Sequence, residues 1–257
     1  MVTLRFPLIL GLLFTLCTER VEAQTDSVVL VGVGQIGTWF TEVTGSNPSD
    51  SPLNAYVHLE PRFEPPGVCS ILCPLYFLLG PNGSQTLDPA QFSFVASGAV
   101  TTVYVTSEEG KSLPSIRARV VNAARPEQTI SVPAFRLSTL LALNPLSLSF
   151  PGATRSATAR TNLVLADLRE PNDRGGRGLS MQVEAYGPAG QRLSSASYTV
   201  GPGQTRFLID VLGQLGVEDL EVGQIRVRKT AGGGHLWGTM FTTNSDGVIT
   251  VSVGAYP

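Results

Sequence analysis

Two cysteines, Cys69 and Cys73, have the residue type and spacing that most directly suggest chemistry in this chain. Two cysteines this close usually pair in an oxidising compartment. The bond would close a very small loop, so its contribution to global stability would be small and its main effect would be to stiffen the loop. Free or metal-bound thiols and a redox pair are the alternatives. The motif is not Cys-x-x-Cys, and a metal would need further ligands.

A glycine pattern, Gly32-Val-Gly34-Gln-Ile-Gly37, follows an apolar run and spells the dinucleotide-binding fingerprint. The fingerprint holds a pyrophosphate only where a helix begins directly after it, because the helix N-terminus supplies the N–H donors. The residues that follow are rich in threonine and are interrupted by Asn47-Pro48 and Ser51-Pro52, so no helix of useful length fits. We therefore predict strand glycines and no cofactor.

The polar residues suggest no catalytic site. The two histidines, His58 and His235, have no Gly-x-Ser-x-Gly nucleophile motif to accompany them. The adjacent carboxylates Glu108 and Glu109 would face opposite sides of a strand, which is not a glycosidase geometry. Oxygen ligands in the turn at 167–173 could hold Ca²⁺, but their spacing matches no EF-hand and arginines would oppose the ion. We predict no enzyme activity and assign no metal site.

The large aromatic residues offer one further chemistry, the stacking of a sugar ring. Trp39 and Trp237 are the candidate ligand contacts, with Tyr76, Phe77 and Tyr256 as additional members of such a platform. The competing interpretation is that large aromatics fill the core of a β-sandwich. Both interpretations require that strands position these side chains.

The first 23 residues have the parts of a secretory signal peptide. A short basic end precedes an apolar stretch from Phe6 to Leu16, and Val21-x-Ala23 fits the small-residue cleavage site. Cys17 would be the acylated residue of a lipoprotein, but Leu16 stands where that processing requires a small residue. We expect cleavage after Ala23 and a location in the periplasm, at the cell surface or outside the cell. The apolar stretch is too short to span a bilayer, and we expect no membrane segment in the mature chain.

The composition favours an all-β protein. The net charge is −2 and charged residues make up only 15%, so there is no basic surplus for nucleic acid. The 27 glycines and 18 prolines punctuate short segments rich in valine, threonine and serine, as turns separate strands. Alternating apolar residues at 100–105 and 220–227 predict half-buried strands. Helical periodicity is confined to one or two turns within Phe207–Leu215.

Similar segments recur in order and predict two tandem β-sandwiches that arose by internal duplication. Gly80-Pro-Asn-Gly83 matches Gly187-Pro-Ala-Gly190, each suited to a hairpin turn, and Ile116-Arg-Ala-Arg119 matches Ile225-Arg-Val-Arg228. Residues 101–105 match 206–209, while residues upstream match at a larger offset. The predicted organisation is a signal peptide (1–23), module 1 with a cysteine-bearing insertion (24–134), linking strands (135–158) and module 2 (159–257).

The second copy resembles a β-sandwich module that recurs in exported bacterial proteins. The resemblance covers residues 160–254 and rests on Arg160-Thr-Asn-Leu, Val183-Glu-Ala-Tyr-Gly-Pro-Ala-Gly190, Val200-Gly-Pro-Gly-Gln204 and Phe241-Thr-Thr-Asn-Ser-Asp-Gly247. Modules of this kind look like immunoglobulin-type or fibronectin-type accessory domains. The resemblance implies adhesion, display or assembly on an unknown protein or glycan surface, with no catalytic residue to transfer. A carbohydrate-binding module is the alternative function, and a secreted hydrolase is a third.

Overall fold

The computed structural model describes residues 26–59, 75–87, 100–108, 110–169, 176–244 and 249–254. The predicted signal peptide and the two cysteines, Cys69 and Cys73, lie outside these residues. Within them the protein is mostly antiparallel β-sheet with two short helices, which confirms the all-β class. Neither helix has the length and apolar character to cross a membrane.

The first half of the chain contains nine strands. They are β1 (Val28–Ile36), β2 (Trp39–Ser46), β3 (Leu53–Leu59), β4 (Leu75–Leu79), β5 (Ser84–Leu87), β6 (Val100–Ser107), β7 (Ser115–Asn122), β8 (Arg125–Val132) and β9 (Phe135–Arg136). One layer has the order β4-β3-β6-β1, and the other contains β2, β7 and β8 with β5 beside β2. Strand β1 joins the layers, because most of it pairs with β6 while its last residues pair with β2.

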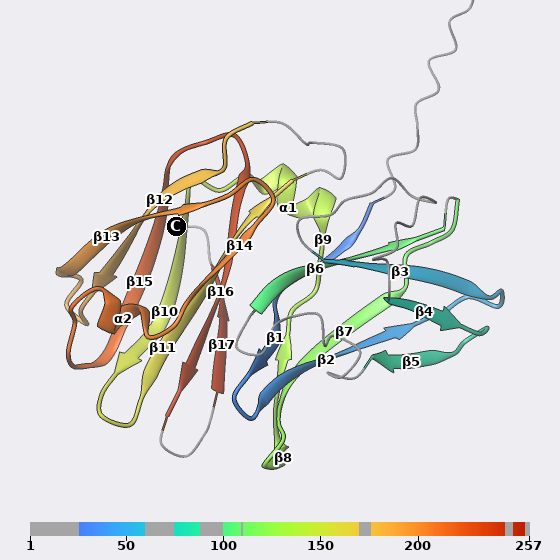
Figure 1. Cartoon of the computed structure of the whole chain (residues 1–257), viewed down its shortest axis with the longest axis horizontal. Helices are drawn as coiled ribbons and strands as arrows, with labels where there is room; N and C mark the ends of the chain where they lie inside the picture. The colour runs from blue at the N-terminus through green and yellow to red at the C-terminus, as the bar shows by residue number, and fades with distance from the viewer. Residues whose placement is uncertain are drawn as a thin grey trace, which may run out of the picture.

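The second half contains eight strands in two four-stranded sheets, of orders β10-β15-β12-β13 and β14-β11-β16-β17. The strands are β10 (Ser147–Arg155), β11 (Arg160–Leu168), β12 (Leu179–Tyr186), β13 (Arg192–Val200), β14 (Thr205–Leu208), β15 (Leu220–Ala231), β16 (His235–Thr243) and β17 (Ile249–Val253). Helix α1 (Leu137–Leu143) connects the halves, and α2 (Val211–Gln214) follows β14. Figure 1 shows the second half in yellow to red beside the first half in blue to green.

The strand order of the first half is repeated in the second. Apart from the short pairing of β1 with β2, strands β1 to β8 take the same neighbours, in the same chain order, as β10 to β17. A hydrogen bond beside the start of the second strand agrees as well: the Gly34 N–H donates to Thr41 Oγ1 of β2, and the Thr154 N–H donates to Thr161 Oγ1 of β11. The two halves are therefore built to one plan, in which Thr41 corresponds to Thr161 and Phe40 corresponds to Arg160.

A glycine bulge also occurs at the same place in both halves. The register of β1 with β6 shifts around Gly32, and that of β10 with β15 shifts around Gly152. Both glycines have positive φ, 101° and 81°, a backbone conformation that residues other than glycine rarely adopt. The bulge is thus part of the shared plan.

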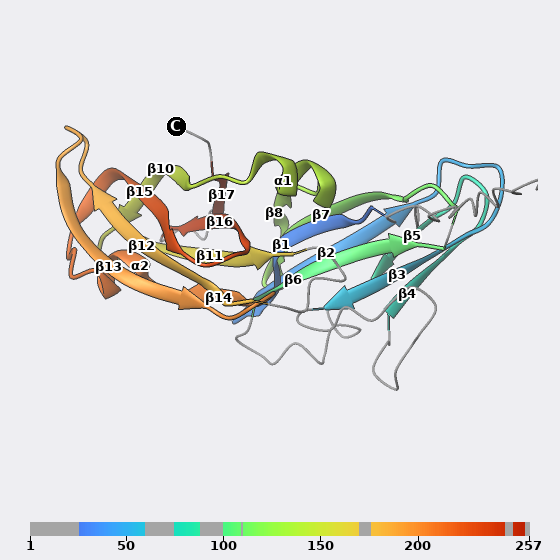
Figure 2. The same ribbon diagram turned by 90° about the horizontal axis from the view of Figure 1, so that it is seen from above.

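The two halves pack on each other through β14, β11, β16 and β17 of the second half and β1, β6 and β8 of the first (Figure 2). One cluster of buried apolar residues runs through both. The hydroxyls of Thr102 and Thr205 are hydrogen-bonded across the junction at 2.9 Å, and the Thr239 hydroxyl donates to the Val31 carbonyl at 3.2 Å. The junction is therefore a packed interface that also contains specific polar contacts.

The junction explains why one predicted strand is buried on both faces. Residues 100–105 form part of β6 as predicted, but Thr102 and Thr106 are buried as well as Val103 and Val105. The prediction of a half-buried strand is therefore wrong here, because the second half covers Thr102. Residues 220–227 of β15 alternate between buried and more exposed positions, as predicted.

Three other local predictions need correction. Leu137–Leu143 is helix α1 and not a linking strand, and β10 is the first strand of the second half, because it pairs with β15. The turn at Gly80–Gly83 closes no hairpin, since β4 pairs with β3 while β5 pairs with β2. The predicted short helix within Phe207–Leu215 is confirmed as α2.

Candidate functional site

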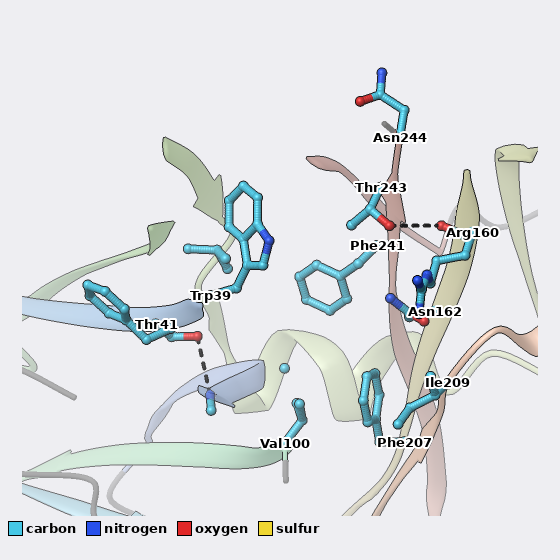
Figure 3. Close-up of a pocket in the computed structure, with 14 residues that line it drawn as sticks. Trp39, Thr41, Val100, Arg160, Asn162, Phe207, Ile209, Phe241, Thr243 and Asn244 are labelled. Atoms are coloured by element: carbon cyan, nitrogen blue, oxygen red, sulfur yellow. Dashed lines mark hydrogen bonds between the residues drawn. The ribbon is translucent and has the colours of Figure 1, made fainter. Parts of the chain in front are cut away.

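A cavity of about 300 Å³ lies where the two halves meet. The first half contributes residues from β1, β2, β6 and β7, and the second half contributes residues from β11, β14 and β16 with the segments that follow them. Figure 3 shows labelled side chains from both halves around this space. The lining residues are Gly32, Gly34, Trp39, Phe40, Thr41, Val100, Val120, Arg160, Asn162, Phe207, Ile209, Phe241, Thr243 and Asn244.

Corresponding strand ends of the two halves form much of the cavity wall. Trp39 and Thr41 lie at the start of β2, and Arg160 and Asn162 lie at the start of the equivalent strand β11. Alternate residues of a strand point to the same face, so each pair presents both of its side chains on one side of its sheet. The repeat also brings the phenyl ring of Phe40 and the guanidinium of Arg160, which occupy equivalent positions, to one cavity.

Much of the wall is aromatic. Trp39, Phe40 and Phe207 are half-buried, and Phe241 is 8% exposed. Ile209 remains 48% exposed at the cavity. Side chains of this kind, partly open to solvent, can bury an apolar ligand face, and aromatic rings add stacking to that contact.

The polar groups of the cavity are held by the backbone. The Gly34 N–H donates to Thr41 Oγ1 at 3.2 Å, and the Thr243 hydroxyl donates to the Arg160 carbonyl at 3.5 Å. The Asp210 N–H donates to Asn162 Oδ1 at 2.9 Å. Because only the oxygen of the Asn162 amide can accept, its NH₂ group is left as a donor.

The two tryptophans named from the sequence have different environments. Trp39 lies in the cavity wall. Trp237 is 3% exposed, and its ring packs edge-on against Phe135, with a centroid separation of 5.1 Å and an interplanar angle of 71°. The prediction of Trp237 as a ligand contact is corrected, because its ring is enclosed in the core. The role of Trp39 remains a prediction.

The structure brings neither histidine into the cavity. His58 Nε2 is 2.9 Å from Thr106 Oγ1 on the neighbouring strand β6, whereas His235 begins β16 opposite Leu168. The glycines of the fingerprint lie in β1 and in the turn to β2, so a hairpin follows them instead of a helix. Gly32 and Gly34 line the cavity, but as strand residues and not as a phosphate loop.

Asp167, the first residue of the acidic turn considered above, is held by contacts within the protein. Asp167 is fully buried, and its Oδ2 accepts from Arg169 Nε at 2.9 Å and from the Gly203 N–H at 3.2 Å. It therefore anchors Arg169 and the β13–β14 turn. Residues 170–173 lie outside the described part of the chain, within which no three His, Cys, Asp or Glu side chains are grouped to hold a metal ion.

Sequence reasoning proposed Trp39 as a ligand contact but gave no binding role to the rest of the site. Arg160, Asn162, Phe207 and Phe241 come from three strands, and the quoted segments that contain Arg160, Asn162 and Phe241 indicated a fold and not a binding site. Their common feature is proximity to strand ends at the junction, which becomes visible only when both halves are in place.

Comparisons with known proteins assign this chain to no family. No family model matches, and no curated protein matches by sequence. Among solved structures, a GalNAc-bound lectin from Pleurotus ostreatus is 12% identical, with 90% of this chain and 76% of the lectin covered and a TM-score of 0.24. The CupB2 chaperone of Pseudomonas aeruginosa is 11% identical, with 89% of this chain and all of the chaperone covered and a TM-score of 0.18.

Proposed function

We propose that this chain is a non-enzymatic binding protein that holds a saccharide in the junction cavity. The observation that carries the proposal is the composition of the cavity wall. It combines the aromatic rings of Trp39 and Phe241 with the hydrogen-bond donors of Arg160 and Asn162. A sugar ring needs both elements, because it has an apolar C–H face for stacking and hydroxyls around its edge for hydrogen bonds. A cavity of about 300 Å³ has the volume for one or two sugar rings.

Trp39→Ala is expected to abolish detectable glycan binding without unfolding the protein, because the indole is half-buried in the cavity wall. The measurement is a glycan array, followed by calorimetric titration of the best ligand. Tyr198→Ala is the matched control, since Tyr198 is a half-buried aromatic residue on β13 and does not line the cavity. Unchanged binding by Trp39→Ala would contradict this site.

We infer a second role, in adhesion or assembly, for the outer face of β3 and β4. Tyr56 and Tyr76 are directly paired across these strands, and Leu78 lies on the same face. Their exposed fractions are 38%, 50% and 61%, which makes an apolar patch at the edge of a sheet. The test is retention of the protein on intact cells and matrix polymers; equal retention of a Tyr56→Ser/Tyr76→Ser variant would argue against this face.

We also propose that the protein is exported and that its two halves descend from one duplicated module. The matching strand order, register and bulge glycines support the duplication. The signal-peptide pattern supports export, and export in turn favours a Cys69–Cys73 disulfide. The intact mass of the mature protein tests the signal peptide and the disulfide. Cleavage after Ala23 and the loss of two hydrogens on disulfide formation each change the mass by a defined amount.

A further inference from the structure

We propose that the saccharide bound in the junction cavity is acidic and that Arg160 recognises its carboxylate. The inference rests on the proposed function and adds the ligand class. Its starting point is the charge of the wall: Arg160 is the single basic residue that lines the cavity, and no carboxylate of the described residues lines it.

The guanidinium of Arg160 is available to a ligand. Its side chain is exposed, and within the described part of the chain it takes part in no ion pair or side-chain hydrogen bond. The contact made by this residue is through its backbone carbonyl, which accepts from the Thr243 hydroxyl. The guanidinium of Arg155 differs, because it is bound to Asp210 and to two carbonyl groups.

The neighbouring donor on β11 suits the same anion. Arg160 and Asn162 are two residues apart on one strand, so their side chains leave the same face of the sheet (Figure 3). The amide of Asn162 is oriented by the Asp210 N–H, which leaves its NH₂ as a donor. The guanidinium fork matches a carboxylate with two parallel N–H···O bonds, and the amide can donate to an adjacent hydroxyl.

The aromatic side of the cavity completes the match to a sugar acid and not to a free anion. Phe40 occupies the position in the first half that Arg160 occupies in the second, and Phe241 pairs with Asn162 across β11 and β16. A ligand that fills the cavity therefore meets a stacking surface and a cationic donor together. A simple anion would use only the second of these.

Calorimetric titration with three ligands of nearly equal shape tests the inference: a galacturonic acid trisaccharide, its methyl ester and the neutral galactose trisaccharide. The acid is expected to bind roughly tenfold to a hundredfold more tightly than the ester, the usual gain from hydrogen bonds to a charged group. The advantage should shrink as salt is raised, because Arg160 is exposed. Arg160→Gln should reduce the acid to the affinity of the ester.

The control and the alternative outcomes separate this inference from the proposed function. Arg192→Gln, on β13 outside the cavity wall, should leave the preference for the acid intact. Equal binding of all three ligands, with loss on Trp39→Ala, overturns the acidic ligand but keeps a glycan site. Preference for a sulfated trisaccharide over the carboxylate also overturns the inference. If an array that includes acidic and neutral glycans shows no binding, both proposals fail.

Discussion

Arg169→Met is expected to lower the free energy of unfolding by about 3–5 kcal/mol, because it leaves the charge of Asp167 buried without its partner. Arg169 is only 4% exposed and Asp167 is fully buried. Besides the ion pair, Arg169 Nη2 donates to the Arg177 carbonyl at 2.8 Å, and the substitution removes this hydrogen bond as well. Urea unfolding at neutral pH measures the change.

Two variants show whether burial is the cause. Arg119→Met removes an ion pair with Glu42 in which Arg119 is 59% exposed, and it should cost less than about 1 kcal/mol. Asp167→Leu/Arg169→Met removes both buried charges and should be more stable than Arg169→Met alone. Equal losses of unfolding free energy for Arg169→Met and Arg119→Met would show that burial does not increase the cost of removing the arginine.

The cost of Arg169→Met should depend on pH. Burial raises the pKa of Asp167 above its ordinary value of 3.8, while Arg169, the Gly203 N–H and Lys229 lower it. The folded protein therefore holds the proton more tightly than the unfolded chain, so ionisation of this group costs stability as the pH rises above 3.8. Without Arg169 the pKa rises further, and the loss at pH 7 should exceed the loss at pH 5. A loss independent of pH would contradict this assignment.

Gly32→Ala should destabilise the protein by about 2–5 kcal/mol, the sum of backbone strain and overpacking. Gly32 has a φ of 101°, and a Cβ atom there would lie 2.8 Å from Phe241 Cζ. The added methyl group would therefore push on the second half of the protein and on a residue of the cavity wall. Thermal or urea unfolding measures the loss, and glycan titration measures the effect on the site.

The repeat provides the matched control for this prediction. Gly152 is the bulge glycine of the second half, with a φ of 81°, but a Cβ atom there would meet no atom within 4 Å. Gly152→Ala should therefore cost only the strain, about 1–2 kcal/mol. The difference between the two variants isolates the packing of the junction. Equal losses of stability for the two variants would show that Phe241 can move away from the added methyl group at no cost, and would contradict close packing at the junction.

The β class could be predicted from the sequence because glycine, proline and β-branched residues act locally. The absence of a helix after Gly37 followed from the same local signals. Burial of both faces of β6 could not be predicted, since Thr102 is covered by Thr205 from a strand far along the chain. Helix α1 was missed because its apolar residues, such as Leu137 and Leu140, were interpreted as a strand.

The repeat shows how far short sequence matches can be used. The upstream matches related the correct strands, β2 to β11 and β3 to β12. The downstream matches related a strand to the one that precedes its structural equivalent. Ile116–Arg119 lies in β7 and Ile225–Arg228 lies in β15, whereas the strand equivalent to β7 is β16. Alternating apolar and arginine residues suit any half-exposed strand, so this pattern identifies strands but not which strand is equivalent to which.

The cavity itself depends on contacts that form only when both halves are present. Trp39 could be proposed from the sequence because its residue type is rare and large, whereas Arg160 is one of many scattered basic residues. What distinguishes Arg160 is its position at the start of β11 beside Asn162 and the cavity. That information lies in strand pairing between distant segments.

The correspondence of Phe40 with Arg160 has a consequence for how such a site can evolve. In a symmetric dimer of identical subunits, a substitution at this position would change both walls of the shared cavity together. Here the two positions belong to one chain, so each can change alone. Covalent linkage of the halves thus permits an asymmetric site within a repeated framework: one strand end is aromatic and its counterpart is cationic, an arrangement that would require two different subunits in a dimer.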